Sequence, residues 1–285
     1  MDILSPKSLP VICLECNEEF ICSNLTCPNG HRMLENNEVF LKTVASGIDN
    51  FDYYWEKFGG KFSSKRIEFA KEILDQKIEI KPSKVVDLGC GDGLYLNLIS
   101  DYFNPELLVG LDISKNALIK ANKNCPNAIL FQSNSENLFF KKNFFDLVLS
   151  IGVLNYLDKP LESVIDMLSI VKPGGNLVIW IYPGNLYTSS KKLKFLRKIL
   201  QLVPKPATKL IYAVIVLMLP LLPTSTGISL RNSSWKECME SVVVSILPKQ
   251  DYLSIISIVT KIETQDIFKV DFFDIQKGLL WIKKI

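Results

Sequence analysis

From about residue 63 onward, short apolar runs alternate with segments whose apolar positions recur at helical spacing. The runs with the length of buried strands are 84–88, 107–112, 128–132, 145–150 and 176–182. The segments with helical periodicity are 64–76, 94–101, 115–123 and 161–171. Because parallel strands need crossover helices, this alternation predicts an α/β fold with a doubly wound, mostly parallel sheet.

The alternation stops at about residue 186. A basic helix at 191–203, an apolar run at 210–222 and a helix near 251–260 are expected there. Two strands at 267–273 and 279–284 then predict a closing antiparallel hairpin. The predicted organisation has five parts, which are a Cys-rich module (1–45), an aromatic connector (46–62), the main core (63–185), an insertion (186–250), and the last helix and hairpin of the core (251–285).

Composition narrows the class of protein. With 48% hydrophobic and 22% charged residues among 285, the chain can build a core, which argues against general disorder. A net charge of +3 gives no sign of a polyelectrolyte, although 186–240 carries 9 bases and 2 acids. No secretory signal opens the sequence, so a cytoplasmic location and reduced cysteines are expected.

The most informative stretch is a strand that ends in alternating glycines, Gly89, Gly91 and Gly93. Glycines there let the backbone approach a ligand, and the helix that follows favours an anionic group. Asp112 ends the next strand, where a carboxylate binds a ribose. A dinucleotide site needs one more glycine, but this chain has leucine in its place. Asp87 in the strand end fits a cofactor that presents a cation, such as the amino group of a methionine moiety.

At these residues the sequence resembles the class I S-adenosylmethionine-dependent methyltransferases, and the resemblance extends over 83–182. Segment 131–138 resembles the loop that contacts adenine, with Asn134 in place of the usual acid, and 144–154 and 171–175 resemble the fourth strand and the turn before the fifth. The resemblance implies a Rossmann-like fold, S-adenosylmethionine as cofactor and S-adenosylhomocysteine as its product. The cofactor-binding residues that it implies are Asp87, Gly89, Gly91, Gly93, Asp112, Ile113, Asn134, Ser135 and Ser150.

No catalytic residue is identified. Many relatives carry histidine after the fourth strand, where this chain has Asn155 and Tyr156, and the sole histidine, His31, lies far upstream. A histidine general base in the catalytic domain is therefore excluded. Tyr156 or Asn155 could orient the acceptor, and packing is the alternative role for both.

Two short chelating pairs stand in the N-terminal module, Cys13 with Cys16 and Cys27 with His31. Thiolate and imidazole ligands at these spacings suit a closed, tetrahedral Zn²⁺ site of structural type. Cys22 is an additional candidate, and incidental reduced cysteines are the alternative interpretation. The run 27–31 resembles the zinc knuckle of the bacterial 23S rRNA guanine-N1 methyltransferases, and this resemblance weakens after residue 31.

These patterns predict a cytoplasmic methyltransferase that acts on a small or lipid-linked metabolite. Methylation of an rRNA base is the enzymatic alternative, and a catalytically silent cofactor-binding or interaction subunit is the alternative from another class. RNA is less favoured because the bases cluster on one helix without interleaved aromatics.

The roles of two segments can each be interpreted in two ways. Among the connector aromatics, Tyr53, Tyr54 or Trp55 either shields a bound sulfonium or docks the zinc module. The insertion is expected to cover the substrate, and its segment 191–222 is either a lid or a peripheral contact with a membrane. The apolar run of 210–222 is too short to span a bilayer.

Overall fold

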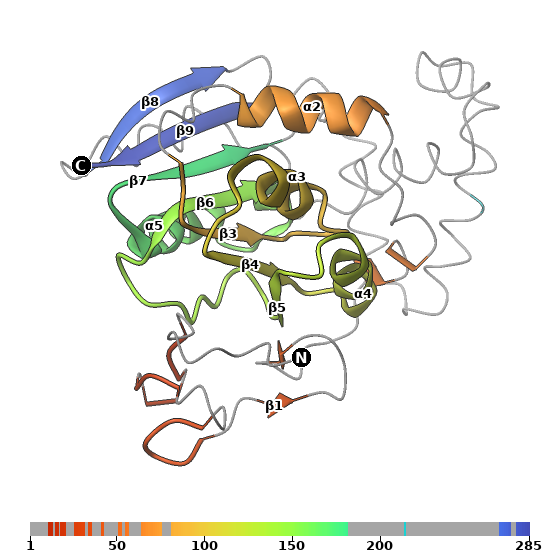
Figure 1. Cartoon of the computed structure of the whole chain (residues 1–285). Coiled ribbons are helices and arrows are strands. Elements are labelled where there is room, and N and C mark those ends of the chain that lie inside the picture. Colours follow the sequence, from red (N-terminus) through yellow and green to blue (C-terminus); the bar gives the residue numbers. More distant parts are fainter. Residues whose placement is uncertain are drawn as a thin grey trace. The chain divides into compact units, whose positions relative to one another are not determined.

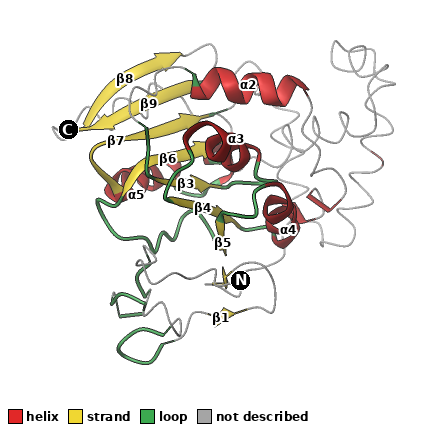
Figure 2. Ribbon diagram, in the orientation of Figure 1, coloured by secondary structure: helices red, strands yellow, loops and turns green. Residues whose placement is uncertain are grey.

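One mixed β-sheet organises the part of the chain that the structure describes (Figures 1 and 2). Its strands are β1 (Leu34–Glu35), β2 (Leu41–Lys42), β3 (Lys84–Leu88), β4 (Leu107–Asp112), β5 (Ile129–Gln132), β6 (Phe145–Ile151), β7 (Val171–Trp180), β8 (Phe268–Asp274) and β9 (Leu279–Lys284). Their order is β1-β2-β5-β4-β3-β6-β7-β9-β8. Every pair from β2 to β7 is parallel, whereas β1–β2, β7–β9 and β9–β8 are antiparallel.

The computed structural model of the chain describes residues 11–13, 15–16, 18–20, 26–31, 34–35, 41–42, 51–52, 55–56, 64–75, 81–181, 214, 268–274 and 278–285. The chain divides into two compact units. One unit consists of Met1–Leu154, Lys159–Ile181 and Ile255–Ile285, and the other of Asn155–Asp158 and Tyr182–Ser254. The sheet belongs to the first unit.

Helices cover both faces of the sheet. They are α2 (Ser64–Leu74), α3 (Leu94–Phe103), α4 (Lys115–Asn124) and α5 (Pro160–Ile170), with a short 3₁₀ helix η1 at Leu154–Tyr156. Helices α2, α3 and α4 lie on the face toward the viewer in Figure 1, and α5 lies behind the sheet. Because both faces are covered, strand residues such as Val85, Val86 and Leu88 are fully buried in succession instead of alternating with polar ones.

The helix starts follow local chemistry. Ser114 caps α4, its hydroxyl accepting from the amide of Ala117 at 3.2 Å. Pro160 opens α5, where its missing N–H costs nothing. Gly93 precedes α3 with a φ of 82°, a left-handed conformation that favours glycine. Each start therefore has the residue type that its backbone position requires.

The predicted fold class is confirmed, since the sheet is doubly wound, mostly parallel and closed by an antiparallel hairpin. The predicted start of the fifth core strand was wrong. That strand was expected at 176–182, but β7 begins at Val171, which pairs with Phe145. The register then shifts until Asn176 pairs with Leu147. The residues Pro173, Gly174 and Gly175 therefore form an irregularity within the strand, not a separate turn before it.

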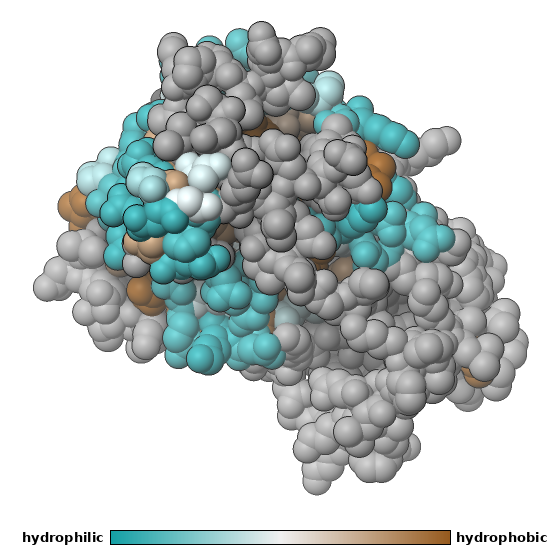
Figure 3. All heavy atoms as spheres, turned by 90° about the horizontal axis from the view of Figure 1, so that it is seen from below, coloured by the Kyte–Doolittle hydropathy of each residue, from teal (hydrophilic) through white to brown (hydrophobic). Residues whose placement is uncertain are grey.

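The insertion predicted at 186–250, apart from Val214, and the helix predicted near 251–260 lie outside the described residues. Among the described helices, none combines the length and the apolar character needed to cross a bilayer. Seen from below, the surface of the described residues is largely hydrophilic, with hydrophobic residues as scattered spots (Figure 3). The exposed large hydrophobic side chains in that part of the chain are Tyr102, Val214 and Ile285.

The chain path fixes where a ligand can bind. From β3 the chain continues outward through β4 and β5 on one side, and β6 and β7 then extend the sheet on the other side of β3. In such open sheets, ligands bind outside the carboxyl ends of the strands where the strand order reverses. Here the reversal lies between β3 and β6, and the glycine turn follows β3 directly.

The close approach of α3 and α4 gives a stability prediction. A Cβ added at Gly93 would lie 2.9 Å from the backbone of Ala121 in α4, whereas a Cβ at Gly174, with a similarly positive φ of 79°, would meet nothing within 4 Å. We expect Gly174→Ala to cost about 1 kcal/mol through left-handed strain alone. Gly93→Ala should cost about 2–4 kcal/mol because overpacking adds to the same strain. Urea unfolding of both variants measures the difference, and equal losses would contradict the packing argument.

Candidate functional site

The glycine turn is folded back on the end of β4. The amides of Gly89 and Cys90 both donate to the carbonyl of Leu111, at 2.6 and 2.9 Å. The amide of Gly91 donates to the Asp112 carboxylate at 2.8 Å. The turn therefore lies over the carboxyl end of β4. This brings Gly91 into contact with Asp112, which is 21 positions later in the sequence.

The Asp112 side chain is buried, and hydrogen bonds to both of its carboxylate oxygens hold it in place. One oxygen accepts from the amide of Gly91 and the other from the amide of Ser114, each at 2.8 Å. Burial raises the pKa of Asp112 to about 6, and the two backbone donors oppose this shift. The group is therefore mainly ionised at pH 7, and each carboxylate oxygen keeps a further lone pair for a ligand hydroxyl.

Asp87 has no such partners. It is 1% exposed, and neither of its carboxyl oxygens has a hydrogen-bond partner within the described residues. Burial raises the pKa of Asp87 to about 8, and the negative charge of Asp112 adds to the shift. Asp87 is therefore mainly protonated at pH 7. An unsatisfied buried acid destabilises the fold, and a bound cation would remove that cost.

Two serine hydroxyls share this unpartnered state. Ser150, near the end of β6, and Ser133, directly after β5, are fully buried, and neither hydroxyl has a hydrogen-bond partner among the residues that the structure describes. Strands β5 and β6 are parallel to β3 within the sheet, so the two serines lie at the same end of the sheet as the carboxyl end of β3. Buried polar groups without partners are rare in folded proteins and mark this edge as a polar ligand site.

A further carboxylate in the turn was missed as a site residue. Asp92 is 1% exposed, and both of its oxygens accept from the guanidinium of Arg66 in α2, each at 3.0 Å. The carbonyl of Asp92 also accepts from the side chain of Asn124 in α4, at 2.7 Å. The one feature of the sequence that could have pointed to Asp92 is its position between two glycines. The pairing itself could not be read from the sequence, because Arg66 lies 26 residues earlier on another element.

The connector lies against the same turn. The Asp52 carboxylate accepts from the Ser114 hydroxyl at 2.6 Å and from the Asn116 amide at 3.1 Å. The Lys120 ammonium donates to the carbonyl of Trp55. A Cβ added at Gly91 would lie 2.6 Å from the Trp55 indole, so this ring covers the glycine backbone. The described connector residues therefore lie against the glycine turn and the start of α4.

Tyr53 and Tyr54, the other connector aromatics considered, lie outside the described residues. The first two residues of the segment predicted to contact adenine, 131–138, belong to β5, and the amide of the next residue, Ser133, donates to the carbonyl of Asp112 at 3.0 Å. The Asn134 side chain accepts from the amide of Glu136 at 3.0 Å, so its amide oxygen stabilises its own loop.

The remaining predicted residues of this region lie on the same edge. Ser135 is buried, and the carbonyl of Ile113 accepts from the side chain of Gln132 at 3.1 Å. The predicted cofactor residues thus come from the ends of four neighbouring strands, β3, β4, β5 and β6.

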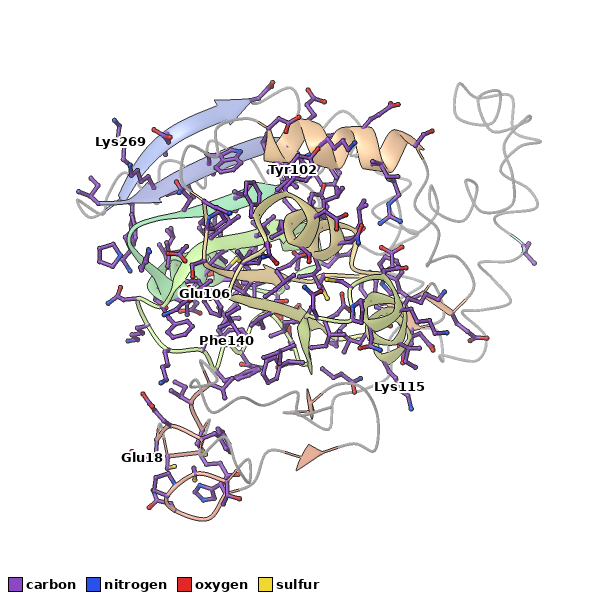
Figure 4. All side chains as sticks on the ribbon, viewed as in Figure 1. Glu18, Tyr102, Glu106, Lys115, Phe140 and Lys269 are labelled. Atoms are coloured by element: carbon purple, nitrogen blue, oxygen red, sulfur yellow. The ribbon has the colours of Figure 1, made fainter. Side chains whose placement is uncertain are left out.

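A separate cluster gathers the predicted metal ligands. One ligand atom from each of Cys13, Cys16, Cys27 and His31 lies within 4.8 Å of all the others. The thiols of Cys16 and Cys27 are 3.6 Å apart, and the Nδ1 atom of His31 is 3.5 Å from the Cys13 sulfur and 3.3 Å from the Cys27 sulfur. Figure 4 shows the sulfur atoms and the imidazole ring together beside Glu18.

The surroundings of the cluster suit a cation. The other ring nitrogen of His31 lies 3.2 Å from the carboxylate of Glu15, an arrangement that orients a ligating histidine. The pKa of Cys16 is lowered to about 6, mainly by a hydrogen bond from the backbone of Glu18. This lower pKa favours the thiolate form of Cys16. Cys22, the additional candidate, lies outside the described residues.

Comparison with known proteins finds similarity to methyltransferases. Residues 86–179 match a family model described as a methyltransferase domain. A ubiquinone/menaquinone biosynthesis C-methyltransferase of Wigglesworthia glossinidia brevipalpis is 32% identical over 118 residues, which cover 39% of this chain and 47% of that protein. A malonyl-[acyl-carrier protein] O-methyltransferase of Halalkalibacterium halodurans is 29% identical over 126 residues, which cover 41% and 46%. The chain spans about half the length of the curated relatives that it matches.

One solved structure has a similar fold over a larger part of the chain. The plantazolicin methyltransferase BpumL, in complex with a pentazolic desmethylPZN analog and SAH, has a TM-score of 0.51 at 13% identity, covering 76% of this chain and 83% of that chain. At this identity the likeness concerns the fold alone. Residues 86–179 of the core are therefore similar to a methyltransferase domain and to proteins named as methyltransferases.

Proposed function

We propose that this protein transfers a methyl group from S-adenosylmethionine to a small or lipid-linked metabolite. The observation that carries the cofactor assignment is the buried carboxyl of Asp87 beside the glycine turn, which has no hydrogen-bond partner among the residues that the structure describes. A ligand that brings a cation to this position would satisfy Asp87, and the amino group of a methionine moiety is such a cation.

The charge of the turn supports this cofactor over a dinucleotide. Asp87, Asp92 and Asp112 are all buried there, and the Arg66 guanidinium forms an ion pair with Asp92. Two carboxyl groups near the turn thus keep no cationic partner within the described residues. A pyrophosphate would add like charge to this site, whereas S-adenosylmethionine carries a sulfonium and an ammonium.

Three of the predicted residues would contact the cofactor directly in this proposal. Asp112 would bind the ribose hydroxyls, Asp87 the ammonium, and the loop around Asn134 the adenine edge. The Trp55 indole over Gly91 would exclude water from the turn. When bound, the cofactor supplies an electrophilic methyl group, whose transfer depends mainly on the alignment of donor and acceptor.

The acceptor is proposed from the chemistry of relatives and of the insertion. One relative is named for C-methylation in quinone biosynthesis and another for O-methylation of a malonyl group on a carrier protein. We assign acceptor recognition to 186–250, which lies largely outside the described residues and is rich in apolar positions.

Methyl labelling with a matched variant tests the activity. A cell extract is incubated with the protein and methyl-labelled S-adenosylmethionine, and the small-molecule, lipid and RNA fractions are counted separately. We expect label in a small-molecule or lipid fraction. Asp112→Ala should bind S-adenosylhomocysteine at least about tenfold more weakly, because charged hydrogen bonds to the ribose are lost. The exposed Asp101→Ala is the control and should bind normally.

Three results would contradict this proposal. Label in RNA would favour the rRNA alternative, and cofactor binding without transfer to any fraction would favour a silent subunit. Unchanged affinity in a folded Asp112→Ala variant, checked by its unfolding midpoint, would refute the cofactor site.

The pKa of Asp87 makes cofactor binding depend on pH. In the free protein Asp87, with a pKa near 8, must lose its proton before it can pair with an ammonium group. Since the complex then holds fewer protons than the free protein, affinity for S-adenosylhomocysteine should increase about tenfold from pH 6.5 to 8 and level off above. Calorimetric titration measures this change.

Two controls isolate Asp87 in that titration. Asp87→Asn should bind S-adenosylhomocysteine more weakly and without the pH dependence. In the wild-type protein, 5′-methylthioadenosine, which lacks the amino-acid part, should also bind without it. The same pH profile in the Asn variant would show that another group is responsible.

We also propose that Cys13, Cys16, Cys27 and His31 bind one structural Zn²⁺. The proposal rests on three thiols and an imidazole nitrogen within 4.8 Å of one another, a donor set that Zn²⁺ prefers. Four protein ligands close the coordination shell and leave no position for a substrate, so the role is structural.

Metal analysis tests the zinc site. Protein purified without chelator should contain one equivalent of zinc per chain, and Cys13→Ser combined with Cys27→Ser should abolish it. Cys125→Ser, at a buried cysteine outside the cluster, is the matched control and should retain the metal. Wild-type protein that contains no metal under these conditions would rule out the site.

A further inference from the structure

The cluster is joined to the core by a short backbone ladder. Residues 11–13 pair on one side with the core, where Val11 forms an antiparallel bridge with Phe140 and the amide of Ile12 donates to the carbonyl of Phe139 at 2.7 Å. On the other side, the amide of Cys13 donates to the carbonyl of Glu18 at 2.8 Å, and Ile12 bridges Glu19. Cys13 is thus both a predicted metal ligand and a member of this ladder.

The core residues that pair with the ladder belong to a cluster of buried phenylalanine side chains. Phe139 and Phe140 are almost fully buried. Both rings pack against Phe131 of β5, with centroids 5.3 and 5.8 Å apart, and Phe140 also meets Phe145 of β6 at 5.4 Å. In Figure 4, Phe140 lies between the central strands and Glu18 of the N-terminal segment. The segment that receives the N-terminal ladder is therefore part of the core of the sheet edge.

The part of the predicted adenine-contacting segment 131–138 that follows β5, here called the adenine loop (133–138), runs between β5 and this aromatic segment. At its start, the Ser133 amide donates to the carbonyl of Asp112. At its end, Phe139 accepts from Ile12 of the ladder. Because a short loop is ordered by the positions of both of its ends, the ladder restricts the loop that is expected to contact the cofactor.

Two more contacts strengthen the connection. Strand β2 extends the sheet by pairing in parallel with β5, Leu41 opposite Phe131 and Lys42 opposite Gln132. The carboxylate of Glu19 lies 2.7 Å from the ammonium of Lys141, two residues beyond Phe139. The N-terminal module therefore meets the core along β5 and along 139–141, which are the two segments that flank the adenine loop.

We propose that the N-terminal metal site acts as a clamp on the cofactor site, so that Zn²⁺ occupancy increases the affinity of the core for S-adenosylmethionine. This proposal rests on the proposed function and its zinc site. With the metal bound, Cys13 is fixed and the ladder holds the end of the adenine loop. Without it, no shared atom holds the four side chains together, the ladder loses its anchor at Cys13, and the cofactor must order the loop as it binds.

Reversible removal of zinc tests the clamp in the full-length chain. Zinc-loaded protein, protein stripped with a chelator and stripped protein reloaded with zinc are titrated with S-adenosylhomocysteine. We expect about tenfold weaker binding, or about 1.4 kcal/mol, in the stripped protein and recovery on reloading. Amide hydrogen exchange should become faster over 133–141 and stay unchanged over β6, β7 and β9, which shows that the core remains folded.

A charge reversal tests the same contact with the metal in place. Lys141→Glu should weaken S-adenosylhomocysteine binding about two- to threefold, a modest effect because Glu19 is largely exposed. Combining it with Glu19→Lys should restore affinity. Lys142→Glu, at the exposed neighbouring position, makes the same change in net charge and should have no effect.

The outcomes separate this proposal from the function on which it rests. Stripped protein that binds within about twofold of the loaded protein, with unchanged exchange over 133–141, would overturn the clamp and leave the cofactor assignment intact. Zinc-loaded protein that does not bind S-adenosylhomocysteine at all would refute the proposed function and the clamp with it. Equal losses in Lys141→Glu and Lys142→Glu would exclude the ion pair from the clamp.

Discussion

The buried carboxylate of Asp112 is the constraint on which the geometry of the site depends. Its two oxygens hold the amides of Gly91 in the glycine turn and Ser114 at the start of α4. Its carbonyl holds Ser133 at the start of the predicted adenine loop. Three segments that are separated in the sequence are thus ordered by one residue at the end of β4. Because charged hydrogen bonds to backbone amides are strong when water is excluded, the turn keeps its shape around this group.

The same site gathers buried carboxyl groups, of which one has no partner among the described residues. Arg66 neutralises Asp92, whereas Asp87 remains buried with a pKa near 8 and no partner within the described residues. A structure selected for stability alone would replace such an acid with an apolar residue. The retained cost is understandable if a cationic ligand stabilises Asp87 when it binds, which is the pattern expected of a binding site.

The N-terminal module is attached by a different kind of contact. Its described residues meet the core mainly through backbone pairing at Val11 and Ile12 and through β2, with Glu19 adding an ion pair. Backbone pairing requires an extended, correctly placed chain, and few local residues are available to impose that conformation. Four ligand side chains gathered around one point would supply the missing restraint.

The sequence alone was sufficient for the order of strands and helices in the core, the glycine turn with Asp112 beside it, and the grouping of Cys13, Cys16, Cys27 and His31. These features depend on local patterns, since hydrophobic periodicity and glycine spacing act over a few residues. The tertiary structure alone decided the pairs Arg66–Asp92, Ser114–Asp52 and Ile12–Phe139, whose members are 26, 62 and 127 positions apart. It also decided the early start of β7, because Val171 is a strand residue only through its pairing with Phe145. Such contacts depend on how whole elements pack, and no local pattern in the chain encodes which distant residue each side chain will meet.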